Sequence, residues 1–144
     1  MRLFRKKIKK IIYLHKATRR RHVEIVNILI SNNATINAKT KDGSTALMIA
    51  VEKGYHEIVK ILINNGADVN AFNKDENTSL ILGIYLLCFR LIVLNYAKGF
   101  LKSLHYLCIQ ACIHGYKGIA ELLIENKANV NGKDKNEHTS LMQG

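Results

Sequence analysis

Four side chains in the last third of the chain have the chemistry of metal ligands: His105, Cys108, Cys112 and His114. Zinc takes four such nitrogen and sulfur ligands in a tetrahedral arrangement. However, Cys108 and Cys112 are four residues apart, so on a helix they share one face and behave as small buried apolar residues. Since no paired Cys-x-x-Cys motif accompanies them, we predict no metal site.

Other patterns that carry chemistry are also missing from the sequence. No set of Ser, His and Asp, no glycine-rich phosphate loop and no pair of carboxylates stands out. We therefore predict that the protein is not an enzyme and that it uses no cofactor.

The composition indicates one folded domain inside the cell. Of the 144 residues, 48% are hydrophobic and 23% are charged, which is typical of a soluble globular domain. Three cysteines form no even disulfide framework. The start of the chain places basic residues among its apolar ones, unlike a secretory signal. We expect a protein that is not secreted and resides in the cytoplasm or nucleus.

The elements that would position any functional side chain are internal repeats with a period of 33 residues. Residues 41–73 read KDGSTALMIAVEKGYHEIVKILINNGADVNAFN, and the second half of residues 8–40, HVEIVNILISNNATINAKT, runs parallel to them. The pattern restarts at Lys74 and continues only at Ala111, so residues 83–110 form an insertion. Lys135 opens a further unit that covers the last ten residues, 135–144.

Each unit has the pattern of two short helices. Thr45 can cap the start of a first helix, and Gly54 can end it. The second helix presents apolar residues from Ile58 to Ile63, and Gly66 fits the left-handed residue that terminates it, where Asn33 is tolerable and Lys127 is poorer. Two such helices cannot bury their apolar faces alone, so stacked units must share one core.

The unit resembles the ankyrin repeat. Residues 41–73 carry DGSTALMIA, GYHEIVKILI and NNGADVNA almost intact, and the resemblance extends over residues 8–141 apart from the insertion. It implies an all-α solenoid of helix-turn-helix repeats with short β-hairpin loops. The expected domain plan is a basic arm with a degenerate first repeat (1–40), one full repeat (41–73), an interrupted repeat (74–134) and the start of another (135–144).

The sequence departs from the family's T-P-L-H motif. The corresponding residues are T-A-L-M from Thr45, T-S-L-I from Thr78 and T-S-L-M from Thr139. Only His15 occupies the histidine position, and there Ile12 replaces the threonine. The hydrogen bonding between these two side chains is therefore missing from every unit, and we expect below-average stability.

The resemblance also implies where a partner would bind, because hairpin tips and first helices of the family line a concave surface that grips proteins. The matching tip residues here are Thr40, Lys41, Asp42 and Ser44, followed by Asn73, Lys74, Asp75, Glu76 and Asn77, and residues 133–137 begin a third tip. The adjoining helix positions are Ala46, Ile49 and Lys53. Tips of mixed charge suit a protein surface better than a phosphate backbone.

The insertion at residues 83–110 falls inside a first helix, whereas natural insertions usually fall in loops. Removing it restores a unit of full length, so we hypothesise that it is translated intron or an error of gene assignment. If the segment is genuine, we expect an additional buried helical pair. A membrane span is the competing interpretation, but residues 80–94 are short for a bilayer and contain Arg90.

The net charge of +11 is concentrated at the start of the chain. Residues 1–22 hold ten of the 22 basic residues and none of the 11 acidic ones. One helical face there carries Leu3, Phe4, Ile8, Ile11 and Ile12. This basic amphipathic arm could contact an anionic membrane or nucleic acid weakly. We favour instead the first helix of a degenerate terminal repeat, because residues 8–17 fall in the repeat register.

These observations predict a noncatalytic scaffold that binds another protein through hairpin tips and first helices, with no small-molecule substrate. The alternative is an adaptor that its basic arm targets to a membrane surface or to nucleic acid.

Overall fold

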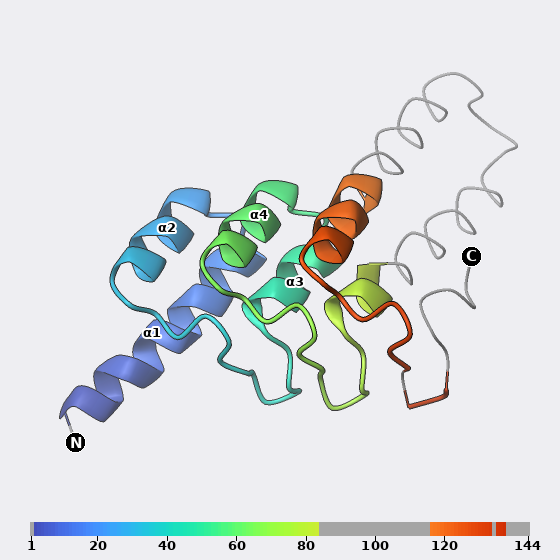
Figure 1. The fold of residues 1–144 in the computed structure, drawn as a ribbon. Coiled ribbons are helices and arrows are strands. Elements are labelled where there is room, and N and C mark those ends of the chain that lie inside the picture. Colours follow the sequence, from blue (N-terminus) through green and yellow to red (C-terminus); the bar gives the residue numbers. More distant parts are fainter. Residues whose placement is uncertain (1, 84–115, 134, 138–144) are drawn as a thin grey trace, which may run out of the picture.

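The computed structural model describes residues 2–83, 116–133 and 135–137, and the side chains of residues 2–10 lie outside this description. The chain forms four labelled helices in the described ranges: α1 (Arg2–Arg19), α2 (Val23–Ser31), α3 (Ala46–Glu52) and α4 (His56–Asn64). Residues 79–83 and 116–125 are also helical. The helices stack in two rows, and the connecting loops project to one side (Figure 1). Within the described ranges the hairpin loops hold no strand, and Phe72 and Thr78 form an isolated antiparallel bridge, which confirms the predicted all-α repeat solenoid.

Helix α3 begins where its capping residue predicts. Thr45 has an extended backbone, and its hydroxyl accepts a hydrogen bond from the Met48 N–H at 3.3 Å. Thr78 does the same for the Ile81 N–H at 3.4 Å. Such a side-chain acceptor satisfies one of the helix's otherwise unpaired N–H groups. Ile12 stands at the corresponding position of the first repeat and has no acceptor, and α1 continues through it back to Arg2.

One histidine partly replaces the missing motif of the first repeat. The buried His15 ring places Nδ1 2.8 Å from the Ile11 carbonyl oxygen and Nε2 3.1 Å from the Ala38 carbonyl oxygen. Whichever ring nitrogen carries the proton donates to its carbonyl. His15 therefore ties α1 to the loop that follows α2.

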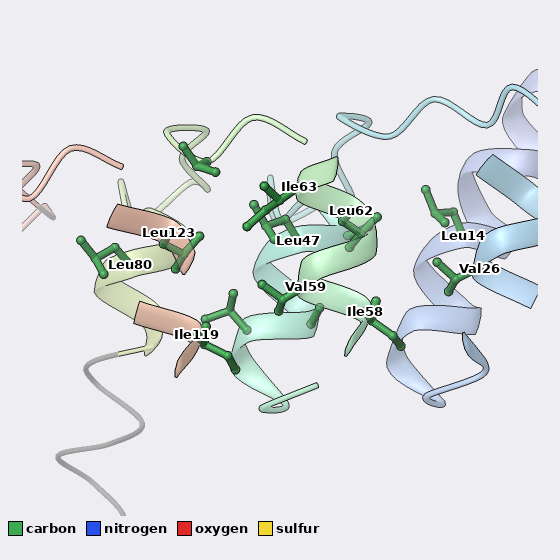
Figure 2. Close-up of a cluster of buried hydrophobic side chains, with 14 of the residues drawn as sticks. Leu14, Val26, Leu47, Ile58, Val59, Leu62, Ile63, Leu80, Ile119 and Leu123 are labelled. Carbon is green, nitrogen blue, oxygen red and sulfur yellow. The ribbon is translucent and has the colours of Figure 1, made fainter. Parts of the chain in front are cut away.

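The core is one continuous cluster built from equivalent residues of successive repeats (Figure 2). Leu14, Leu47 and Leu80 are 33 residues apart in sequence and are 0%, 1% and 2% exposed. The second helices contribute Ile58 and Leu62 from α4, and Ile119 and Leu123 from residues 116–125, all buried. Each pair of helices covers its neighbour, as the stacking of repeats that cannot fold alone requires.

Asparagine side chains join each repeat to the next in the same register. The Asn37 amide donates to the Gly66 carbonyl oxygen, and its oxygen accepts from the Asp68 N–H. Asn70 makes the same two contacts with Lys127 and Asn129. The sequence separations are 29 and 31 residues for the first pair and 57 and 59 for the second. The difference of 28 is the length of residues 83–110, so the described helices on either side of that segment stack in regular register.

Helix ends and hairpin tips use left-handed residues at the same repeat positions. Gly43, Gly54 and Gly66 have φ of 84°, 68° and 86°. The corresponding non-glycine residues also have φ between 58° and 66°: Arg21, Asn33, Glu76, Lys127 and Glu137. The predicted left-handed termination at Gly66, Asn33 and Lys127 is confirmed.

Candidate functional site

The first hairpin tip is held by hydrogen bonds among its own predicted site residues. The Thr40 hydroxyl donates to the Ser44 carbonyl oxygen and accepts from the Ser44 N–H, both at 3.0 Å. The Ser44 hydroxyl donates to the Asp42 carboxylate at 2.6 Å. This bond is the largest cause that lowers the pKa of Asp42 to about 2, and the nearby Thr40 side chain and the charge of Arg19 add to the effect. The tip is a preformed loop with an ionised carboxylate.

The second tip is organised by one asparagine side chain. The Asn73 side-chain oxygen accepts from the Asp75 N–H at 2.9 Å and from the Asn77 N–H at 3.0 Å. The Asn73 N–H donates to the Asn77 carbonyl oxygen, which closes the loop. Glu76 lies at its exposed corner with φ of 61°. The Asn73 side chain therefore holds the backbone of the second tip, as the Thr40 hydroxyl holds that of the first.

Backbone hydrogen bonds connect neighbouring tips. The Lys74 N–H donates to the Asp42 carbonyl oxygen at 3.1 Å, and the Lys135 N–H donates to the Asp75 carbonyl oxygen at 3.3 Å. A Cβ atom at Gly43 would lie 2.9 Å from the Lys74 nitrogen, so glycine suits the closer of these two approaches. The structure thus brings the tip residues predicted from the sequence into one row (Figure 1).

Two helix positions of the predicted surface are not accessible. Ala46 is 0% exposed and Ile49 is 2% exposed, so both are core residues and we remove them from the candidate surface. The physical reason is that six of the seven residues of α3 are buried, from Ala46 to Val51, so this short helix has no outward face before its end. Lys53, just after α3, is exposed and pairs with Glu52 at 3.6 Å.

In the first repeat, the positions equivalent to Ala46, Ile49 and Lys53 are exposed, although the predicted surface did not include them. Tyr13, Lys16 and Arg20 precede Ala46, Ile49 and Lys53 by one period of 33 residues. All three are exposed, and Tyr13 retains 53% of its accessible area. Stepping back one period from the implied surface would have identified them.

A second row of side chains runs along the hairpins at Lys39, Phe72 and Lys133, which occupy the same repeat position. Phe72 is 56% exposed. The Lys39 ammonium lies 4.4 Å from its ring centroid and donates to its carbonyl oxygen at 2.7 Å. Beside this ring lies an open hollow of about 480 Å³, whose lining residues are Asn70, Phe72, Glu76, Thr78, Asn129, Gly132 and Lys133.

Comparison with known families agrees with this geometry. A family model described as ankyrin repeats in three copies matches residues 5–73, and a model of the single ankyrin repeat matches residues 103–135. The chain belongs to the ankyrin repeat family. A comparison with curated proteins gave no match.

The family match and the structure differ on the first half of the last ankyrin repeat. The match takes the contiguous residues 103–135. In the structure, residues 79–83 lie beside α3 and bury Leu80 against the core. The expected domain boundaries, including the insertion at 83–110, therefore stay a prediction, and residues 84–115 lie outside the described part of the chain.

The basic arm is helical and packs against the neighbouring helices. Leu14 and Ala17 are buried, as are their equivalents Leu47 and Ala50, and α1 packs against both α2 and α3. α1 includes residues 8–17, which fall in the repeat register, and their assignment to a degenerate terminal repeat stays a prediction. Figure 1 shows the N-terminal half of α1 extending past the stacked helices.

Two further predictions concern residues that the structure does not describe. His105, Cys108, Cys112 and His114 all lie outside the described ranges. Within those ranges no group of three or more His, Cys, Asp or Glu residues is placed to hold a metal ion. No helix among the described residues is both long and apolar enough to cross a membrane.

Proposed function

We propose that the protein is a noncatalytic scaffold that binds another protein through its row of hairpin tips and the exposed residues of α1. Ankyrin repeats are generally protein-interaction modules, and protein binding is the usual role of this repeat. The observation that carries the proposal is the linked row of preformed tips, with the Lys74 N–H bonded to Asp42 and the Lys135 N–H bonded to Asp75.

A preformed row of this kind favours binding because the backbone of each tip is already ordered. The cost that remains is that of immobilising the contacting side chains, roughly 0.5–1.5 kcal/mol for each one. Here the Thr40 hydroxyl and the Asn73 side-chain oxygen already hold the tip backbones. The side chains of Lys41, Lys74 and Glu76, which belong to these two tips, are exposed and available to a partner.

The proposal is tested by affinity capture of a partner from the native source. We expect the triple variant Lys41→Ala, Lys74→Ala and Glu76→Ala to lose the partner. Ser44 is left intact because its hydroxyl holds Asp42. The matched control replaces Glu57 and Lys60, exposed residues of α4 in the helix row away from the tips.

Loss of the partner from both variants, or from neither, would argue against binding by the tips. A third chain that lacks residues 1–12 tests the adaptor alternative. If that deletion abolishes association with anionic liposomes or RNA while the tip variant leaves it unchanged, the basic arm rather than the tip row determines what the protein binds.

A further inference from the structure

The tips carry three lysines at one repeat position: Lys41, Lys74 and Lys135. The backbone bonds between neighbouring tips fix how far apart these residues stand. The tips follow helices that stack side by side, so successive lysines are spaced by about 10 Å, the distance between packed helix axes. A row of cations at a regular, fixed distance is a geometric feature that a ligand can match.

The acidic residues of the same tips are mostly engaged within the protein. Asp42 accepts from the Ser44 hydroxyl at 2.6 Å, and Asp75 pairs with Lys135 at 2.6 Å. Glu137 pairs with Lys133 at 2.8 Å. Among the described residues, Glu76 is the one tip carboxylate without such a contact. The lysine contacts therefore offset the charges of Asp75 and Glu137, whereas Asp42 stays ionised and is held by the Ser44 hydroxyl.

The ammonium groups of Lys41 and Lys74 have no hydrogen bond or ion pair with any residue in the described ranges. Both side chains are exposed. α1 presents the exposed basic residues Lys16 and Arg20, and Arg19 of the same helix is close enough to Asp42 to favour its ionised form. The surface from the first tip to α1 is therefore positively charged and contains an exposed aromatic ring at Tyr13.

We infer that this surface binds an extended acidic segment of the protein partner, with carboxylates at about every third residue lying against Lys41 and Lys74. In the extended polyproline II conformation a chain rises about 3.1 Å per residue and completes one turn in three residues, so side chains three residues apart share one face and stand about 9 Å apart, close to the spacing of the tips. The inference rests on the proposed protein-binding function and specifies its ligand. Asp42, Asp75 and Glu76 alternate with the lysines along the row, so carboxylates spaced to meet the lysines fit this row better than the continuous negative charge of a nucleic-acid backbone.

Fluorescence anisotropy of the full chain with synthetic peptides tests this inference. The probe is a labelled peptide in which Gly-Ser-Glu is repeated. One control peptide has the same composition with its glutamates contiguous, and another has lysine in place of glutamate. We expect the periodic acidic peptide to bind at least about threefold more tightly than the contiguous one, and its affinity to fall as ionic strength rises from about 50 to about 300 mM. Equal affinity for the two acidic peptides would overturn the spacing argument.

Charge reversal locates the site on the protein. The double variant Lys41→Glu and Lys74→Glu should weaken the periodic peptide at least about tenfold, while Lys60→Glu on α4 should change it less than about twofold. Circular dichroism would confirm that both variants keep the helical content of the parent chain. Equal weakening by both variants, or by neither, would overturn the inference.

Two outcomes separate this inference from the proposed function. If a captured partner depends on the tips but cross-links to them through a segment without acidic residues, the scaffold proposal stands and the acidic ligand is wrong. If single-stranded oligonucleotides bind at the tips more tightly than the periodic peptide and lose affinity in the double variant, the tip row is a nucleic-acid surface and both proposals fail.

Discussion

The middle repeat and the described parts of its two neighbours share the same arrangement but differ in the residues at the left-handed positions. The middle repeat has glycine at all three left-handed positions, 43, 54 and 66, whereas its neighbours have Arg21, Asn33, Glu76 and Lys127 at equivalent ones. A non-glycine residue in that conformation costs roughly 1 to 2 kcal/mol, less for asparagine. Stacking holds the flanking repeats in a conformation that their sequences favour less.

The same contrast appears inside the core. Val51 and Ala46 are buried apolar residues of α3. Their equivalents are Thr18 in α1 and Ser79 in the next repeat, both 0% exposed, and neither hydroxyl oxygen has a hydrogen-bond partner in the described structure. The comparison teaches that the middle repeat is the stable centre and that its neighbours limit the stability of the whole.

The largest expected effect is a cavity in the centre of the stack. Leu62→Ala removes a fully buried side chain of α4 and should lower the free energy of unfolding by about 2–5 kcal/mol. Its equivalent in α2, Leu29, is partly buried, so Leu29→Ala should cost clearly less. Urea denaturation monitored by circular dichroism measures both variants. Equal losses would mean that the two repeats contribute equally to the core.

The next largest change in the free energy of unfolding is expected when residues are exchanged between equivalent core positions. Thr18→Val removes a buried hydroxyl without a partner while keeping the shape of the side chain, and it should raise the free energy of unfolding by about 1 kcal/mol. Val51→Thr introduces the same defect into α3 and should lower it by about 1–3 kcal/mol. A Thr18→Val chain that unfolds at a lower urea concentration than the parent would contradict this account.

Lysine and glycine can be exchanged in the same way at the left-handed positions, with a smaller expected change in stability. Lys127 has φ of 64°, and Lys127→Gly should stabilise the chain by about 1 kcal/mol because the backbone strain disappears. A Cβ atom at Gly66 would meet no atom within 4 Å. Gly66→Lys therefore reports the backbone cost alone and should destabilise the chain by a similar amount. Thermal denaturation of the two variants should show opposite shifts, and shifts of the same sign would refute the strain argument.

Local patterns in the sequence predicted most of the fold, because the helix caps, the left-handed residues and the apolar period are encoded within single repeats. Thr45, Gly66 and Leu47 illustrate this. The burial of Ala46 and Ile49 could not be predicted in the same way, since it depends on which elements pack against α3 in space. The bond from Lys135 to Asp75 spans 60 residues. It could not be predicted from the pattern within a single repeat, because it joins two different repeats.

The smallest expected effect concerns the charge at the first tip. The pKa of Asp42 in the folded chain is lowered from 3.8 to about 2, chiefly by the Ser44 hydroxyl. A carboxyl with a lowered folded pKa stabilises the fold above its unfolded pKa, and this contribution is lost as the pH falls from about 4 to about 2. Because solvent screens this exposed group, we expect it to contribute only about a few tenths of a kcal/mol to the free energy of unfolding.

In Ser44→Ala the hydrogen bond is absent, so NMR titration should show the Asp42 pKa returning toward 3.8. The same titration of the parent chain tests the tip geometry, since an Asp42 pKa near 3.8 there would mean that the hydrogen bond does not form in solution.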